Sequence, residues 1–208
     1  MRIDDKVLSD IDEQIEEIGL EFARTQGSIL TEDDLKCILY SRLIRLPFFA
    51  KPETTKDSWI TANYVHSEVS WFDSASKLTI KPDLTILDPQ DLSITHGVQN
   101  RIQLPSKGFH VYGNAIIFEL KFVRGAKGIT ERTLQTIRKD VDKIKQLYDK
   151  MLHDGSTFKL ICYIVFFAKV NNKRNKLIKN FQEEMKGDKH FRVFYKCANV
   201  SFTDPNAS

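Results

Sequence analysis

The sequence predicts one α/β domain in which helices flank a central mixed sheet. Segments with the periodicity of amphipathic helices alternate along the chain with short apolar runs that are typical of buried strands. The chain has 208 residues, of which 41% are hydrophobic, and this is enough to bury one substantial core. We therefore expect a single domain over residues 1–208.

Two helices are expected first. Over about residues 6–26, apolar residues recur at three- and four-residue steps, and Gly27 is expected to end this N-terminal helix. The second helix begins at Thr31, because Thr-Glu-Asp-Asp places a carboxylate three residues after a hydroxyl, as in a capping box. It runs to about Leu43, with leucines four residues apart along one side.

Three strands are expected next, over residues 64–69, 78–87 and 115–123, with a loop over about residues 88–113 before the third. The later elements are a helix with one apolar stripe, a strand apolar on both faces, a short helix and a final alternating strand. The first of these helices is expected over residues 132–152 and should end at Gly155. The strand that follows it is expected over residues 158–167, the short helix over 175–185 and the final strand over 190–195.

Three charged residues fall inside the predicted strands. Asp83 lies in the second strand, and Glu119 and Lys121 lie in the third. Because side chains alternate across a strand, Glu119 and Lys121 share one face with Ile117 and Val123. Burying an unpaired ion costs roughly several kcal/mol, so we expect these charges to have partners or a chemical role.

A metal site is one role that this arrangement favours. Asp83 on a neighbouring strand supplies a second carboxylate beside Glu119, and a hard cation such as Mg²⁺ prefers one or two carboxylates with waters and phosphate oxygens. The alternative is a structural ion pair at the sheet surface, with Asp83 as an ordinary strand-start residue. Apolar residues on both sides of Glu119 and Lys121 favour the first interpretation.

The motif Pro82-Asp83 followed by Glu119-Leu120-Lys121 resembles the signature of the PD-(D/E)xK nuclease superfamily, which includes restriction endonucleases and Holliday-junction resolvases. The resemblance covers about residues 29–168. It implies a restriction endonuclease-like core in the order helix, three strands, helix, strand. The N-terminal helix and a C-terminal helix and strand over about residues 173–197 are then additions to a nuclease-like domain.

The resemblance also implies a mechanism. Asp83, Glu119 and the backbone carbonyl of Leu120 would hold Mg²⁺ or Mn²⁺, and Lys121 would orient or activate the attacking water. The expected activity is hydrolysis of phosphodiester bonds by a metal-dependent nuclease, with DNA as the expected substrate of an endonuclease and RNA not excluded. A nuclease-like module that binds nucleic acid or a protein partner without cutting is the alternative, and a purely structural subunit is a third.

Two further carboxylates are candidate catalytic residues. Many superfamily members carry a glutamate on the first core helix, and Glu32 matches that position best; its other interpretation is a helix cap whose charge complements the helix dipole. Glu68 precedes Asp83 by one strand and could reach the same metal. Its other interpretation is an exposed strand residue.

Basic residues follow the Glu119 strand and continue along the next helix. Arg124, Lys127, Arg138 and Lys145 are the candidate nucleic-acid-binding residues, because lysine and arginine neutralise phosphates. Lys145 is of interest because some superfamily members use a lysine from this helix near the metal. The alternative for each is a solvated helix face paired with neighbouring aspartates.

Composition bounds the remaining possibilities. A net charge of +3 permits binding of nucleic acid without requiring it. Cys37, Cys162 and Cys197 are far apart and are expected to be reduced, buried thiols. The sequence has no apolar leader segment and no stretch of about 20 apolar residues, so we expect a cytoplasmic protein with no membrane partner. Superfamily members often dimerise to cut two strands, so a homodimer is one implied assembly.

Overall fold

The protein is described by a computed structural model covering residues 3–25, 27–56, 60–72, 78–94, 98–99, 102–103, 109–111, 113–125, 127–153, 159–170 and 176–198. Within these ranges it is an α/β structure with four α-helices and a mixed five-stranded sheet. The helices are α1 (Asp5–Arg24), α2 (Glu32–Leu43), α3 (Glu131–His153) and α4 (Lys176–Lys186).

The central sheet has the strand order β13-β12-β11-β6-β3. Strands β11, β12 and β13 run parallel, and β6 is antiparallel to both β11 and β3. The strand bounds are β3 Val65–Ser67, β6 Leu84–Leu87, β11 Ala115–Val123, β12 Leu160–Ala168 and β13 Phe191–Cys197.

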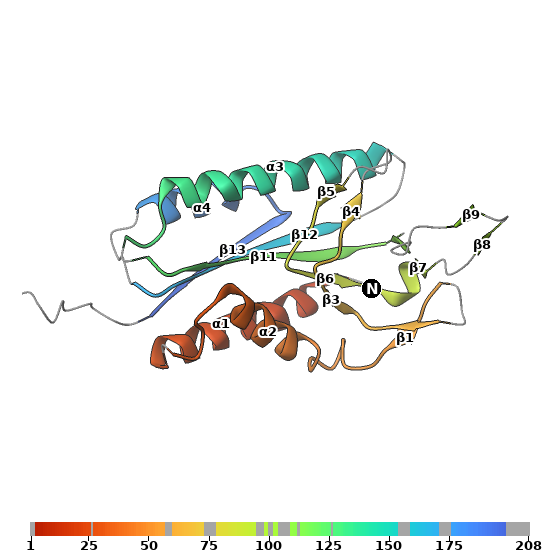
Figure 1. Cartoon of the computed structure of the whole chain (residues 1–208), viewed down its shortest axis with the longest axis horizontal. Coiled ribbons are helices and arrows are strands. Elements are labelled where there is room, and N and C mark those ends of the chain that lie inside the picture. Colours follow the sequence, from red (N-terminus) through yellow and green to blue (C-terminus); the bar gives the residue numbers. More distant parts are fainter. Residues whose placement is uncertain are drawn as a thin grey trace, which may run out of the picture.

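Helices cover both faces of this sheet, with α3 and α4 on one face and α1 and α2 on the other (Figure 1). Successive side chains of β11 point to opposite faces of the sheet and so contribute to both hydrophobic clusters. Phe118 and Leu120 pack on the α1–α2 side, whereas Ile117 packs on the α3–α4 side. Strand β12 is buried along its whole length, as its uniformly apolar sequence predicts.

The sequence predicted the helices and the two long strands closely. Helix α2 begins with a capping box in which Thr31 and Asp34 exchange hydrogen bonds between side chain and backbone. Helix α1 ends at Arg24, slightly before the predicted end. The predicted end of the helix after residue 132, Gly155, lies outside the described residues.

The predicted single strand over residues 78–87 is wrong. The run divides into β5 (Leu78–Ile80), which pairs with β4 (Trp71–Phe72), and β6, which joins the central sheet. The break lies at Pro82 and Asp83, where proline lacks the backbone N–H that a ladder requires. Asp83 therefore occupies a bend that leads into the sheet and not the middle of a strand. The observed strand β3, Val65–Ser67, is also shorter than the strand predicted over residues 64–69.

The loop predicted over residues 88–113 also requires correction, because part of it is regular. It contains a 3₁₀ turn (Pro89–Asp91), and β7 (Leu92–Ile94) pairs antiparallel with β10 (Phe109–Val111). Two small hairpins were not predicted: β1 (Glu53–Thr54) with β2 (Thr61–Ala62), and β8 (Val98–Gln99) with β9 (Ile102–Gln103).

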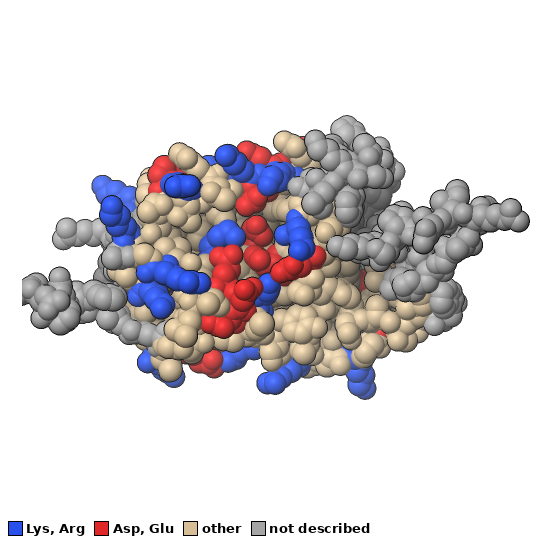
Figure 2. All heavy atoms as spheres, in the orientation of Figure 1, with Lys and Arg blue, Asp and Glu red and all other residues tan. Residues whose placement is uncertain are grey.

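Acidic and basic side chains are mixed on the face shown in Figure 2, and acidic side chains gather near its middle. None of the three cysteines, all of which lie in the described ranges, forms a disulfide; Cys37 is exposed on α2, and of the three only Cys162 is fully buried. Among the described helices, none combines the length and the apolar character needed to cross a membrane.

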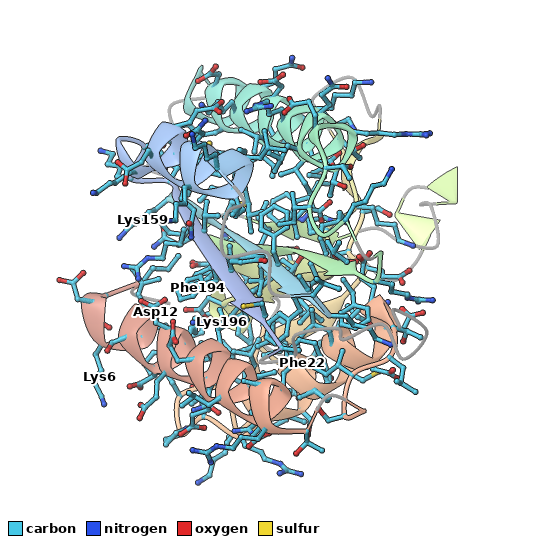
Figure 3. The ribbon with its side chains drawn as sticks, turned by 90° about the vertical axis from the view of Figure 1, so that its left-hand side faces the viewer. Lys6, Asp12, Phe22, Lys159, Phe194 and Lys196 are labelled. Carbon is cyan, nitrogen blue, oxygen red and sulfur yellow. The ribbon has the colours of Figure 1, made fainter. Side chains whose placement is uncertain are left out.

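Helix α1 is tied to the edge strand β13 by ion pairs (Figure 3). Arg192 pairs with Asp12, and Lys196 pairs with Glu16. The stem of Lys196 crosses α1 at Gly19, where an added Cβ would lie 2.6 Å from Cδ of Lys196. A side chain at position 19 would therefore require the stem of Lys196 to move.

Replacing Gly19 by Ala should destabilise the fold although alanine is the better helix former. The added methyl group would displace Lys196, and overpacking of this kind costs about 1–3 kcal/mol. We expect the melting temperature to fall by about 2–4 °C or more for a chain of this size, measured by circular dichroism. Gly27→Ala is the control, because nothing lies within 4 Å of a Cβ there. Equal melting temperatures for the two variants would contradict this account.

Candidate active site

The candidate site forms where β6 separates from β11. Strand β6 pairs with β11 only as far as Leu84 and Phe118, whereas β11 continues to Val123. Beyond Phe118, this side of β11 is no longer covered by β6. Backbone N–H groups of alternate residues point to the same side of a strand, so those of Leu120 and Phe122 need other acceptors.

Two carboxylates supply these acceptors. The N–H of Leu120 donates to Oδ2 of Asp83 over 2.7 Å, and the N–H of Phe122 donates to Oε2 of Glu32 over 3.0 Å. Asp83 is itself held by its backbone, because its N–H donates to the carbonyl oxygen of Phe118 over 3.0 Å. The open side of β11 thus brings together an aspartate from the bend before β6 and a glutamate from α2.

Glu119 lies beside Asp83. The last ladder pair is Phe118 with Leu84, so the next position along each strand places Glu119 opposite Asp83. Opposite residues of antiparallel strands project to the same face. Within the described part of the chain, Glu119 accepts no hydrogen bond and forms no ion pair.

Burial dominates the electrostatics of both carboxylates. It raises the pKa of Glu119 to about 8; Lys121 opposes the rise, and the charges of nearby carboxylates add to it, namely Asp83, Asp140 and Glu32. Burial also raises the pKa of Asp83, although the N–H of Leu120 and the charge of Lys121 oppose that rise. The site therefore disfavours two negative charges unless a further cation is present.

Lys121 is the cation that the chain itself provides. Its Nζ lies 3.5 Å from Oε1 of Glu32. Burial lowers the pKa of Lys121, but the carboxylates of Glu119, Glu32 and Asp83 raise it by more, so the net shift is upward. Lys121 is therefore an ammonium group held between Glu32 and the Asp83–Glu119 pair.

The donor atoms fit a hard divalent cation held in part by water and substrate. No group of three or more His, Cys, Asp or Glu side chains placed to hold a metal occurs among the described residues. Asp83 and Glu119 offer two carboxylates, and the carbonyl of Leu120 faces the same side of β11 as its N–H. Mg²⁺ is commonly bound through one or two carboxylates, with waters and phosphate oxygens completing its shell.

Glu32 reaches this site and does not cap its helix. Thr31 and Asp34 make the capping hydrogen bonds of α2, each over 3.0 Å. This leaves the side chain of Glu32 to contact Phe122 and Lys121. Of the two interpretations that the sequence left open for Glu32, this geometry favours membership of the site.

The structure does not bring Glu68 into the Asp83–Glu119 pair. Glu68 follows β3 in a bend with φ of 54°, and its carboxylate binds Nζ of Lys36 at 2.9 Å and also Nζ of Lys81. These two lysines lower the pKa of Glu68 to about 2. Its N–H donates to the carbonyl oxygen of Asp83 over 3.1 Å, so its backbone still borders the site.

Two of the candidate nucleic-acid-binding residues lie near the site. Arg124 and Lys127 are exposed in the segment after β11, and the charge of Arg124 acts on Asp34 at the start of α2. This places Arg124 at the end of β11 that the carboxylates occupy, and Lys127 follows three residues later. Neither residue forms an ion pair with another described residue, and both stay candidates for phosphate contacts.

The other two basic candidates have structural partners elsewhere. Arg138 pairs with Glu131 and Glu184, each at 3.0 Å, and lies 5.8 Å from the ring centroid of Phe181, so it links α3 to α4. Lys145 pairs with Asp188 at 3.3 Å, near the beginning of β13. The structure therefore does not bring Arg138 or Lys145 to the Asp83–Glu119 pair.

Three charged residues near the site were not predicted. Asp140 lies in the apolar stripe of α3, three residues after Ile137 and four before Ile144, and its charge reaches Glu119. A carboxylate within a buried helical stripe is a signal that sequence periodicity could have shown. Lys36 lies one helical turn after Glu32, and Lys81 lies two residues before Asp83, but nothing local distinguishes them from surface lysines.

Comparison with known protein families, with curated proteins and with solved structures gave no match. The resemblance to the PD-(D/E)xK superfamily therefore rests on the motif residues and stays a prediction.

The raised pKa of Glu119 predicts that the metal-free protein loses stability as pH rises. Between its ordinary pKa of 4.5 and about 8, the unfolded chain has lost the Glu119 proton while the folded protein retains it. The free energy of unfolding therefore falls with rising pH across this window and levels off above it. Glu119→Gln should remove this part of the pH dependence in melting curves recorded with EDTA.

Glu183→Gln is the matched control for this measurement, because Glu183 is exposed on α4. It should keep the wild-type pH dependence. A Glu119→Gln protein whose stability changes with pH as the wild type does would show that Glu119 has an ordinary pKa.

Proposed function

We propose that this protein is a metal-dependent nuclease that hydrolyses phosphodiester bonds and acts as a DNA endonuclease. The observation that carries the proposal is the convergence of Asp83, Glu119 and Lys121 at one point of the sheet, where β6 separates from β11. Two half-buried carboxylates with raised pKa and an adjacent ammonium group are the components that this chemistry requires.

Asp83, Glu119 and the carbonyl of Leu120 would hold Mg²⁺ or Mn²⁺. When bound there, the metal would lower the pKa of a coordinated water from 15.7 toward about 7 and would offset charge on the phosphoryl oxygens. Lys121 donates hydrogen bonds to the attacking water and keeps it in line with phosphorus. Glu32 holds the ammonium group of Lys121 in place from α2.

The order of elements supports assignment to the restriction endonuclease-like fold. If only the strands of the central sheet are considered, α2, β3, β6, β11, α3 and β12 occur along the chain as helix, three strands, helix, strand. The strands of the two-stranded sheets lie between them. In this proposal α1, α4 and β13 are additions to that core. The small hairpins between β6 and β11 are a further departure from its simplest form.

DNA is the proposed substrate, and a homodimer that cuts both strands is the proposed assembly. Arg124 and Lys127 are exposed in the segment after β11, and in this proposal they contact phosphates of the bound DNA. Specificity for a sequence or a DNA structure would depend on residues outside the catalytic group.

A second candidate function has one observation in its favour. Asp83 and Glu32 each accept a hydrogen bond from a backbone N–H of β11, so both would stabilise the strand even in a protein without activity. A nuclease-like module that binds nucleic acid without cutting would keep these contacts. Glu119 distinguishes the two candidate functions. It accepts no backbone hydrogen bond from a described residue, so this structural role does not account for its position.

Plasmid cleavage tests the proposal. Wild-type protein with Mg²⁺ or Mn²⁺ should convert supercoiled plasmid to nicked or linear forms on a gel, and EDTA should abolish the reaction. Asp83→Ala and Glu119→Gln should remove metal binding, and Lys121→Ala should slow cleavage by about 100-fold or more, the scale of a lost proton-transfer or water-positioning group. RNA of matched length should be assayed in parallel.

Lys179→Ala and Asp142→Asn are the control variants, since both residues are exposed on helices. Both variants should cut as the wild type does. Binding of plasmid without cleavage under every metal condition would favour the non-cutting module, and cleavage that survives Glu119→Gln would overturn the assignment of the active site.

A further inference from the structure

Two lysines lie beside the active site and are held by an exposed carboxylate. Nζ of Lys36 lies 2.9 Å from Oε1 of Glu68, and Lys81 binds the other oxygen of the same side chain. Asp33 adds a second contact to Lys36 at 2.9 Å. Glu68 therefore bridges a lysine of α2 and a lysine of the bend that carries Asp83.

Both lysines are close to the catalytic group. Lys36 lies four residues after Glu32 on α2, about 6 Å away along the helix axis. The positive charge of Lys36 also acts on Asp83. Lys81 precedes Asp83 by two residues and opens toward solvent, with 47% of its side chain exposed. A strand of nucleic acid with one phosphate at the Asp83–Glu119 pair would bring a neighbouring phosphate to these ammonium groups.

The backbone of Glu68 indicates that its position is under constraint. Its φ of 54° lies in the left-handed region, and it is the one residue other than glycine with positive φ in the described part of the chain. Left-handed conformations are uncommon for glutamate and occur often at functional sites. The N–H of Glu68 donates to the carbonyl oxygen of Asp83, which keeps the bridging side chain next to the site.

A phosphate group could readily replace the carboxylate of Glu68 between Lys36 and Lys81. About half of the Glu68 side chain is exposed, and ion pairs of this kind contribute little net stability because water screens them. A phosphodiester carries the same single negative charge and accepts the same N–H hydrogen bonds as a carboxylate. Replacing Glu68 by a phosphate would therefore cost little and would retain both cations in their places.

We propose that Lys36 and Lys81 form a phosphate subsite for the DNA strand adjacent to the scissile bond, and that Glu68 occupies this subsite until DNA displaces it. The inference rests on the proposed nuclease function. It assigns Glu68 a role as an internal substitute for phosphate and not as a metal ligand.

Binding measurements test the subsite separately from cleavage. A fluorescein-labelled DNA duplex of about 30 base pairs is titrated with protein in Ca²⁺, and fluorescence anisotropy is followed at several salt concentrations. The double change Lys36→Ala with Lys81→Ala should weaken binding about tenfold and should flatten the slope of log affinity against log salt by about 2. Lys6→Ala is the control, because Lys6 also pairs with an aspartate but lies on α1 with 84% of its side chain exposed; it should bind as the wild type does.

Glu68→Gln provides the discriminating result. It keeps the size of the side chain and removes the charge, so it should strengthen DNA binding about threefold if the carboxylate competes with phosphate. Glu68→Gly should strengthen binding to a similar degree and should also raise the melting temperature, because glycine adopts positive φ without strain.

Weaker DNA binding by both Glu68 variants would overturn the inference, because Glu68 would then position the lysines for DNA and not compete with it. Wild-type affinity and salt slope in the double lysine variant would overturn it as well. If the wild type cuts plasmid and these variants bind as it does, only the subsite is wrong. A wild type that neither cuts nor binds DNA overturns both the subsite and the nuclease function.

Discussion

The separation of β6 from β11 at Pro82 is the constraint on which the site depends. A strand that loses its neighbour exposes backbone N–H groups that must find acceptors. In this chain the acceptors are the carboxylates of Asp83 and Glu32, which come from a bend and from α2. The same hydrogen bonds that complete the sheet therefore place negative charges beside Glu119 and Lys121. The structural role of these residues and the chemical role that we propose for them have one geometric cause.

The electrostatic consequence is a site with an excess of buried negative charge. Burial raises the pKa of both Asp83 and Glu119, and one ammonium group, that of Lys121, does not reverse either shift. A divalent cation would allow both carboxylates to ionise together. The metal affinity that we propose for the site and the loss of stability that we predict for the ion-free site at high pH are two results of the same burial.

The arrangement of helices on both faces of the sheet determines which elements can contribute to the site. Alternation along β11 directs Phe118 and Leu120 toward α1 and α2, and directs Glu119 toward α3. Helix α2 reaches around the open side of β11 with Glu32, whereas α3 places Asp140 near Glu119 from the other face. Strand β11, helices α2 and α3 and the bend before β6 thus meet at one point.

The sequence by itself determined what depends on local periodicity and capping. It predicted the bounds of β11, the capping box of α2 and the shared face of Glu119 and Lys121, because each follows from neighbouring residues. Only the tertiary structure decided where the run over residues 78–87 breaks, and which carboxylates reach β11. It also decided that Glu68 pairs with lysines. The physical reason is the separation of the interacting residues along the chain. Strand register and ion pairs join residues far apart in the sequence, and their energies depend on packing that no local pattern encodes.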